Sequence, residues 1–101
     1  MKARVSVDRD KLAEFCRRHH IRKLGFFGSV LRDDFNLDSD VDVLVEFEPG
    51  EEPGFIALSC IEEELAALLG WRRVDLVSAK YLNRRLRERV LGEVEVQYAE
   101  G

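Results

Sequence analysis

Residues 25–45 read GFFGSVLRDDFNLDSDVDVLV, and this stretch contains the strongest structural signals in the chain. Residues 23–27 predict a short apolar β-strand that ends at Gly28. Residues 41–47 place Asp42, Leu44 and Glu46 between apolar residues, which is the alternation of a second strand. Between the strands we expect a short helical turn followed by a polar loop. The stretch therefore predicts a strand–turn–loop–strand unit whose polar residues collect in the connection.

The backbone at Gly28 and Ser29 could bind an anion. Gly28 has no Cβ, so a phosphate group can approach the main chain closely there. Ser29 adds a hydroxyl group, and the N–H groups of the following turn point towards any bound anion. Arg32, one turn later, carries a planar guanidinium group suited to phosphate oxygens. These residues predict a phosphate-binding turn.

Asp40 and Asp42 lie two residues apart, so on a strand both carboxylates leave the same face. Two like charges held about 6.5 Å apart along a strand repel each other and favour a cation between them. Mg²⁺, which prefers oxygen ligands, would fit such a pair. The alternative from these residues alone is a strand with one solvated acidic face, although Leu44 makes that face only partly polar.

Helical and strand-like periods alternate through the rest of the chain. We expect helices over residues 8–19, 55–69 and 79–91, the last with Ser78 as its N-cap, and strands over 71–77 and 93–98. Cys16 and Cys60 fall in helices, where we expect small buried residues rather than a disulfide or a zinc site. The order is typical of an α/β domain, a sheet with helices packed on it.

The composition indicates one globular domain over residues 1–101. Hydrophobic residues make up 46% of the chain and charged residues 36%, which excludes the low-complexity and disordered classes. No apolar run approaches the roughly 18–20 residues of a membrane span, and the charged first residues lack the apolar segment of a signal peptide. We therefore expect a cytoplasmic protein with no membrane contact. The formal net charge of −4 argues mildly against nucleic acid as a partner.

The spacing from Gly28 to Asp42 resembles the signature of the minimal nucleotidyltransferase family, small members of the DNA polymerase β-like nucleotidyltransferase superfamily. That signature is Gly-Ser, ten residues, then Asp-x-Asp, and the resemblance extends over nearly the whole chain. The residues that carry it, including two typical of the minimal branch, are Gly28, Ser29, Arg32, Ser39, Asp40 and Asp42.

The family also has a third carboxylate on a later strand, for which Asp75 is the best match. We expect the strands over 23–27, 40–47 and 71–77 to lie in one sheet, with Asp75 on the face of the first two aspartates. The alternative for Asp75 is a salt bridge with Arg72 or Arg73 at a sheet edge. One departure from the family is Asp33, where many relatives have Gly, because it adds negative charge near the phosphate-binding turn.

The resemblance implies a polymerase β-like fold, with helices packed on a small mixed sheet, and a metal-dependent transfer reaction. Asp40, Asp42 and Asp75 would be catalytic and would hold two Mg²⁺ ions. The phosphates of ATP or another nucleoside triphosphate would be bound by the remaining motif residues, Gly28, Ser29, Arg32 and Ser39. The acceptor hydroxyl would attack the α-phosphorus, pyrophosphate would leave, and Asp75 would help to take the proton.

Relatives of this kind are often paired with a small helical protein of the HEPN class, as antitoxin and RNase toxin. The resemblance thus implies, as our first interpretation, a protein adenylyltransferase that transfers AMP from ATP to such a toxin. Two alternatives stay open: transfer to a small hydroxylated molecule with a helical partner subunit, and a non-catalytic module that only covers the toxin. A nucleic-acid polymerase is the least favoured, and the sequence leaves homo-oligomerisation open.

Overall fold

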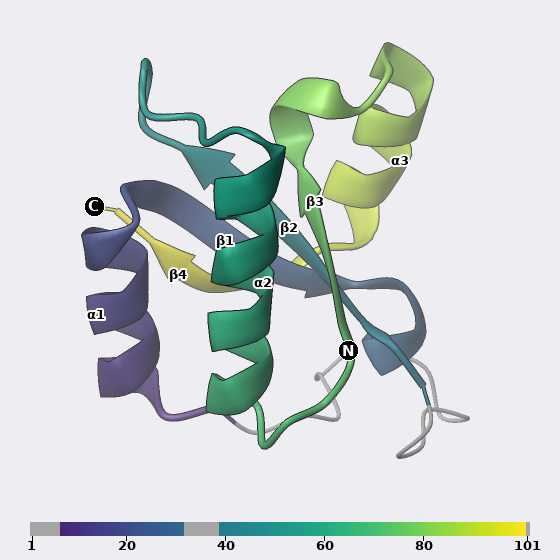
Figure 1. The fold of residues 1–101 in the computed structure, drawn as a ribbon. Helices are drawn as coiled ribbons and strands as arrows, with labels where there is room; N and C mark the ends of the chain where they lie inside the picture. Colours follow the sequence, from purple (N-terminus) through teal and green to yellow (C-terminus); the bar gives the residue numbers. More distant parts are fainter. Residues whose placement is uncertain (1–6, 32–38, 101) are drawn as a thin grey trace.

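A computed structural model describes residues 7–31 and 39–100 of the chain (Figure 1). No helix in these two ranges is long and apolar enough to cross a membrane. The helices, strands and short 3-10 turns (η), in chain order, are α1 (Arg9–Arg18), β1 (Ile21–Phe27), η1 (Gly28–Leu31), β2 (Val41–Phe47), α2 (Phe55–Leu68), β3 (Val74–Ser78), η2 (Ala79–Tyr81), α3 (Arg84–Glu93) and β4 (Glu95–Ala99).

One four-stranded sheet has the strand order β3-β2-β1-β4. β1 pairs antiparallel with both β2 and β4, whereas β2 and β3 are parallel, so the sheet is mixed. α2 provides the crossover that parallel neighbours require. The prediction that three of the strands, β1, β2 and β3, belong to one sheet is confirmed, and β3 lies at its edge.

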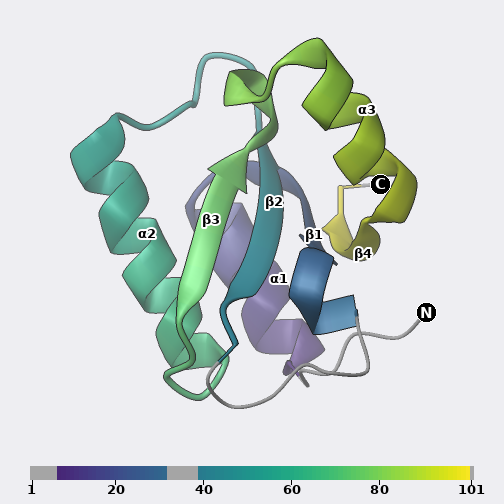
Figure 2. The same ribbon diagram turned by 90° about the vertical axis from the view of Figure 1, so that its right-hand side faces the viewer.

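Different helices cover the two faces of the sheet (Figures 1 and 2). α1 and α2 lie on one face, where Phe15 and Leu65 belong to the main buried core. α3 lies on the other face, where Leu44 and Val90 belong to a smaller buried cluster. Successive residues of β2 point to opposite faces, so Val43 contributes to the main core and Leu44 to the smaller one.

The third helix differs from the sequence prediction. The expected helix over 79–91 is wrong at both ends, because residues 79–81 form η2 and α3 spans Arg84–Glu93. Asn83 is the N-cap: its side-chain oxygen accepts a hydrogen bond from the Leu86 N–H at 2.9 Å, whereas Ser78 makes no such bond. The helix also runs past Gly92, where the sequence predicts its end, and Glu93 is its last residue.

The connection between α2 and β3 is longer than predicted. Gly70 and Trp71 both have left-handed backbone conformations, with φ of 79° and 64°, so the chain is still turning where a strand was expected. β3 therefore begins at Val74 instead of residue 71. The Trp71 side chain is 76% exposed and takes no part in the core.

The two cysteines have different surroundings. Cys16 is buried as predicted, and burial raises the pKa of its thiol to about 12. Cys60 is exposed, so the prediction of burial is wrong for this residue. Its neighbour Ile61 lies on the buried face of α2, and adjacent residues of a helix point in different directions.

Gly25 and Gly92 offer a test of the packing between β1 and the end of α3. A Cβ on Gly25 would collide with the Val94 side chain and lie 3.1 Å from the Glu95 carbonyl oxygen, so Gly25→Ala should lower the free energy of unfolding by about 1–3 kcal/mol. Nothing lies within 4 Å of a Cβ on Gly92, and Gly92→Ala should raise that free energy by roughly 0.5–1 kcal/mol. Urea denaturation of both variants measures the difference, and equal effects would contradict the close approach at Gly25.

Candidate functional site

Gly28 begins η1 directly after β1 and has a left-handed backbone with φ of +73°. A Cβ at this position would collide with the Oδ2 atom of Asp42. Both observations require glycine: the backbone conformation disfavours other residues, and the Asp42 carboxylate fills the space of a side chain. Ser29 follows in the same turn.

β2 and β3 lie side by side (Figure 2), and Asp42 and Asp75 are register partners in this parallel pair. Paired residues of neighbouring strands point to the same face about 4.8 Å apart, so the two carboxylates leave the sheet side by side. Their face is the one on which Leu44 and Val77 pack beneath α3, opposite the main core. The predicted placement of Asp75 on the face of Asp42, away from the main core, is confirmed, whereas its convergence with Asp40 stays a prediction. Gly28 directly after β1, Asp42 on β2 and Asp75 on β3 thus form a row across three neighbouring strands.

Asp40 lies one residue before β2 and forms an ion pair with Arg73, whose Nε is 3.1 Å from its Oδ1. The Arg73 carbonyl oxygen also accepts a hydrogen bond from the Val41 N–H at 2.8 Å. Arg73, which with Arg72 is one of the two arginines in the alternative for Asp75, thus forms an ion pair with Asp40. Ser39, next to Asp40, is half-buried, and the predicted site residue Arg32 lies outside the described residues, as does Asp33.

Among residues 7–31 and 39–100, no group of three or more His, Cys, Asp and Glu side chains is arranged to hold a metal ion. Asp40 contacts a guanidinium group instead, and this neutralises one carboxylate of the site. The donor set nevertheless suits a hard divalent cation, because Asp42 and Asp75 are adjacent and Asp40 is two residues from Asp42.

Glu93 is a residue of the site that the sequence analysis missed. Its Oε1 accepts a hydrogen bond from the Gly28 N–H at 3.2 Å. An acidic side chain therefore already contacts the turn that the sequence predicts to bind phosphate. The sequence pattern assigns Glu93 to the alternation of the last strand, and only the longer α3 brings it to Gly28. This contact indicates that the Gly28 amide is accessible to a negatively charged group.

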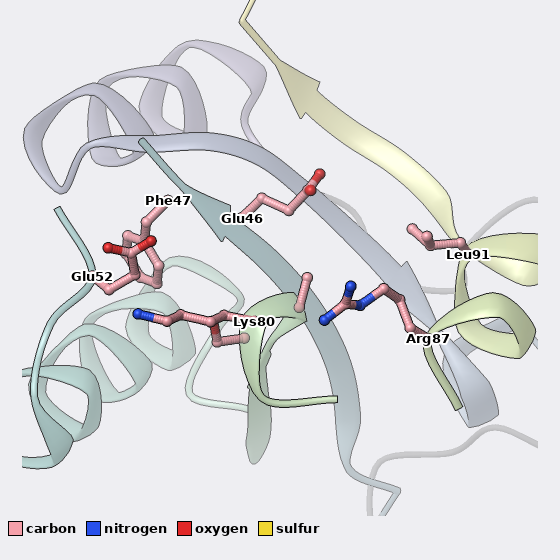
Figure 3. Close-up of a pocket in the computed structure, with 8 residues that line it drawn as sticks. Glu46, Phe47, Glu52, Lys80, Arg87 and Leu91 are labelled. Atoms are coloured by element: carbon pink, nitrogen blue, oxygen red, sulfur yellow. The ribbon is translucent and has the colours of Figure 1, made fainter. Parts of the chain in front are cut away.

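Two hollows lie at opposite ends of β2. The larger, about 600 Å³, lies between α2 and the edge strand β3 and includes Asp40 and Asp75 in its wall. The smaller, about 200 Å³, is lined by Glu46, Lys80 and Arg87 (Figure 3). Leu44, between Asp42 and Glu46 on the same face, is buried under α3, so the core separates the smaller hollow from the row of site residues.

The chain has clear relatives among known proteins. Residues 9–96 match the model of a family described as a nucleotidyltransferase domain. The chain is 44% identical over 81 residues to the protein adenylyltransferase MntA of Thermococcus cleftensis, and this alignment covers 80% of the chain and 79% of the relative.

Solved structures share the fold. A structure assigned to a minimal nucleotidyltransferase has a TM-score of 0.71 and 40% identity, and the match covers 86% of this chain and 86% of that one. A complex of a tri-AMPylated HEPN toxin with an MNT antitoxin, from Shewanella oneidensis, contains a chain with a TM-score of 0.66 and 22% identity, matched over 90% of this chain and 69% of that one. The expected polymerase β-like fold with a small mixed sheet is confirmed.

Gly28→Ala should destabilise the protein more than Gly50→Ala. Both glycines have left-handed φ values, +73° and +81°, so both changes carry a strain of about 1–2 kcal/mol. Only at position 28 does the new Cβ meet another residue, the Asp42 carboxylate, since nothing lies within 4 Å at Gly50. Urea denaturation measures the two free energies of unfolding.

The Asp42→Ala background provides the control, because it removes the carboxylate that the new Cβ would meet. There, Gly28→Ala should destabilise the protein no more than Gly50→Ala does. If the extra destabilisation remained in this background, the contact between Gly28 and Asp42 would be wrong.

Proposed function

This chain belongs to the nucleotidyltransferase domain family, and on that premise we propose that it transfers AMP from ATP to a hydroxyl group of a partner protein. The observation that carries the proposal is the register pairing of Asp42 with Asp75 beside a glycine that leaves room for the Asp42 carboxylate. Nucleotidyl transfer depends on positioning and charge neutralisation more than on covalent help from the protein. Adjacent carboxylates next to an exposed backbone amide suit that requirement.

The divalent cation would be Mg²⁺, and two such ions would be held by Asp40, Asp42 and Asp75. Bound there, the metal would neutralise phosphate charge and favour the ionised form of the acceptor hydroxyl. Asp40 must give up its ion pair with Arg73 to take part. That exchange is inexpensive, because the Asp40 and Arg73 side chains are 57% and 72% exposed.

Gly28, Ser29, Arg32 and Ser39 would bind the triphosphate. The Gly28 N–H would donate to a phosphate oxygen in place of Glu93. Glu93 yields this position readily, because a carboxylate at the C-terminal end of α3 is disfavoured by the helix dipole. The Asp42 carboxylate beside Gly28 then lies next to the phosphates.

The reaction forms a bond between the acceptor oxygen and the α-phosphorus and breaks the bond from that phosphorus to the bridging oxygen of the leaving pyrophosphate. The acceptor proton passes to the Asp75 carboxylate, which is exposed at the edge strand and accessible to an incoming group. Asp42, half-buried between Gly28 and Asp75, positions the nucleotide next to the Asp75 carboxylate.

The acceptor we propose is a HEPN-type RNase toxin, which the added AMP would neutralise, so that this chain acts as an antitoxin in the cytoplasm. The 44% identical relative is named a protein adenylyltransferase, and a structural neighbour contains an AMPylated HEPN toxin. Incubation with a HEPN-type protein, Mg²⁺ and ATP, followed by mass spectrometry, tests the proposal. An AMP adduct on the partner supports it, whereas tight binding without an adduct would favour the non-catalytic alternative.

Asp75→Asn should retain ATP binding but slow transfer by a hundredfold or more, roughly the effect of losing a general base. Asparagine keeps the size of the side chain and cannot accept the proton. Calorimetry gives the ATP affinity and a quenched time course gives the rate. Near-normal transfer would remove Asp75 from catalysis, and loss of ATP binding would assign it to the nucleotide instead.

Glu93→Gln should tighten ATP binding by roughly threefold to tenfold, because it removes a negative charge that competes with the triphosphate for the Gly28 amide. Glu88→Gln is the matched control, since Glu88 lies on the same helix and pairs with Arg84 at 3.6 Å. The same ATP titration in both variants separates a local effect from a general change in net charge. Equal affinities in the two variants would contradict competition at Gly28.

A further inference from the structure

α3 is attached to the rest of the molecule by very little buried surface. Of its ten residues, Arg84–Glu93, only Val90 is buried. Arg87 and Leu91 are four residues apart, so they share one face of the helix, and both line the smaller hollow. Arg87 points from α3 into this hollow (Figure 3). A helix of a globular protein usually buries an apolar stripe, so this face of α3 is suited to further contacts.

The opposite side of the smaller hollow ends in an exposed apolar corner. Phe55 and Ile56, the first residues of α2, are 86% and 85% exposed, although both side chains are large and apolar. Glu51 and Glu52 lie just before them in the chain, and Glu52 lines the hollow. Exposed apolar residues bordered by charged ones are typical of a surface that binds another protein.

The two sides of the hollow carry opposite charges. Glu51 and Glu52 belong to the loop before α2, whereas Lys80 belongs to η2 and Arg87 to α3. In the two described ranges of the chain, no ion pair joins Glu52 to Lys80 or Arg87, so their charges can bind a partner. The acidic corner (Glu51, Glu52, Phe55 and Ile56) and the basic face (Lys80, Arg87 and Leu91) are therefore complementary to each other.

We propose that a second copy of this chain covers this surface in a two-fold symmetric dimer. Both complementary halves lie at the same end of one molecule (Figures 1 and 2), and a two-fold interface uses the same patch on both subunits. The acidic corner of each copy then packs on the basic face of the other. Phe55 and Ile56 lie against the partner's Leu91, and Glu52 faces the partner's Arg87.

The surface is separate from the row of site residues. The hollow is lined by Glu46 and Phe47 at the end of β2, whereas Asp42 lies near the start of that strand, and the buried Leu44 lies between them. The dimer therefore leaves Gly28 and its neighbours accessible. The inference does not rest on the proposed function, and its test needs neither ATP nor an acceptor.

Sedimentation equilibrium over a series of protein concentrations tests the dimer. The mass of the unmodified chain should rise with concentration from 11.7 kDa towards twice that value. Phe55→Ser should raise the dimer dissociation constant about tenfold, because it removes an aromatic side chain from the centre of the contact. Trp71→Ser is the matched control, since Trp71 is also exposed but follows the other end of α2, and its dissociation constant should equal that of the unmodified chain.

A charge exchange tests the pairing of Glu52 with Arg87 across the interface. Glu52→Arg and Arg87→Glu should each weaken the dimer, because like charges then face each other in both contacts. An equimolar mixture of the two variants should associate again, since each contact in the mixed dimer joins an arginine to a glutamate. Glu63→Arg and Arg89→Glu change the net charge equally at exposed residues outside the hollow, and each should dimerise like the unmodified chain.

Two results would overturn the proposal. One is a chain that stays monomeric at every concentration. In that case, weaker binding of a HEPN-type protein by Phe55→Ser than by Trp71→Ser would assign the surface to such a partner instead of a second copy. The other is a dimer that neither Phe55→Ser nor the charge exchange affects, which would place the interface elsewhere on the chain.

Discussion

The parallel pairing of β2 with β3 is the constraint on which the site depends. It sets Asp42 directly beside Asp75, and a slip of one residue would move Asp75 to the opposite face, into the main core. The crossover through α2 makes this pairing possible, and the burial of Leu76 and Val43 on one face and of Leu44 on the other holds the register. The core thus fixes the position of the carboxylates without contacting them.

Gathering acidic groups at one end of a sheet is unfavourable unless each is balanced. Two of these groups have a local contact in the described structure: Arg73 neutralises Asp40, and the Gly28 amide donates a hydrogen bond to Glu93. Both contacts lie near the surface and are weak, so a triphosphate with its cation can replace them. Both Asp40 and the Gly28 amide are therefore accessible to a ligand.

Much of the fold could be predicted because its signals are local. The alternation in residues 41–47 sets the faces of β2, and the interruption of apolar residues by Asp75 marks its place opposite the core. The start of α3 could not be predicted, because Ser78 and Asn83 are both competent N-caps and tertiary packing decides between them. The contacts of Arg73 and Glu93 could not be predicted from the sequence either, because each joins segments that are far apart in the chain.

The most direct test of AMP transfer is the fate of the individual phosphates of ATP. The chain, Mg²⁺ and a HEPN-type toxin would be incubated with ATP radiolabelled at the α-phosphate and, separately, at the γ-phosphate. Attack at the α-phosphorus predicts label on the toxin from the α position only, with the γ label recovered in pyrophosphate. Transfer of the γ label to the toxin, or no label from either position, would contradict the account.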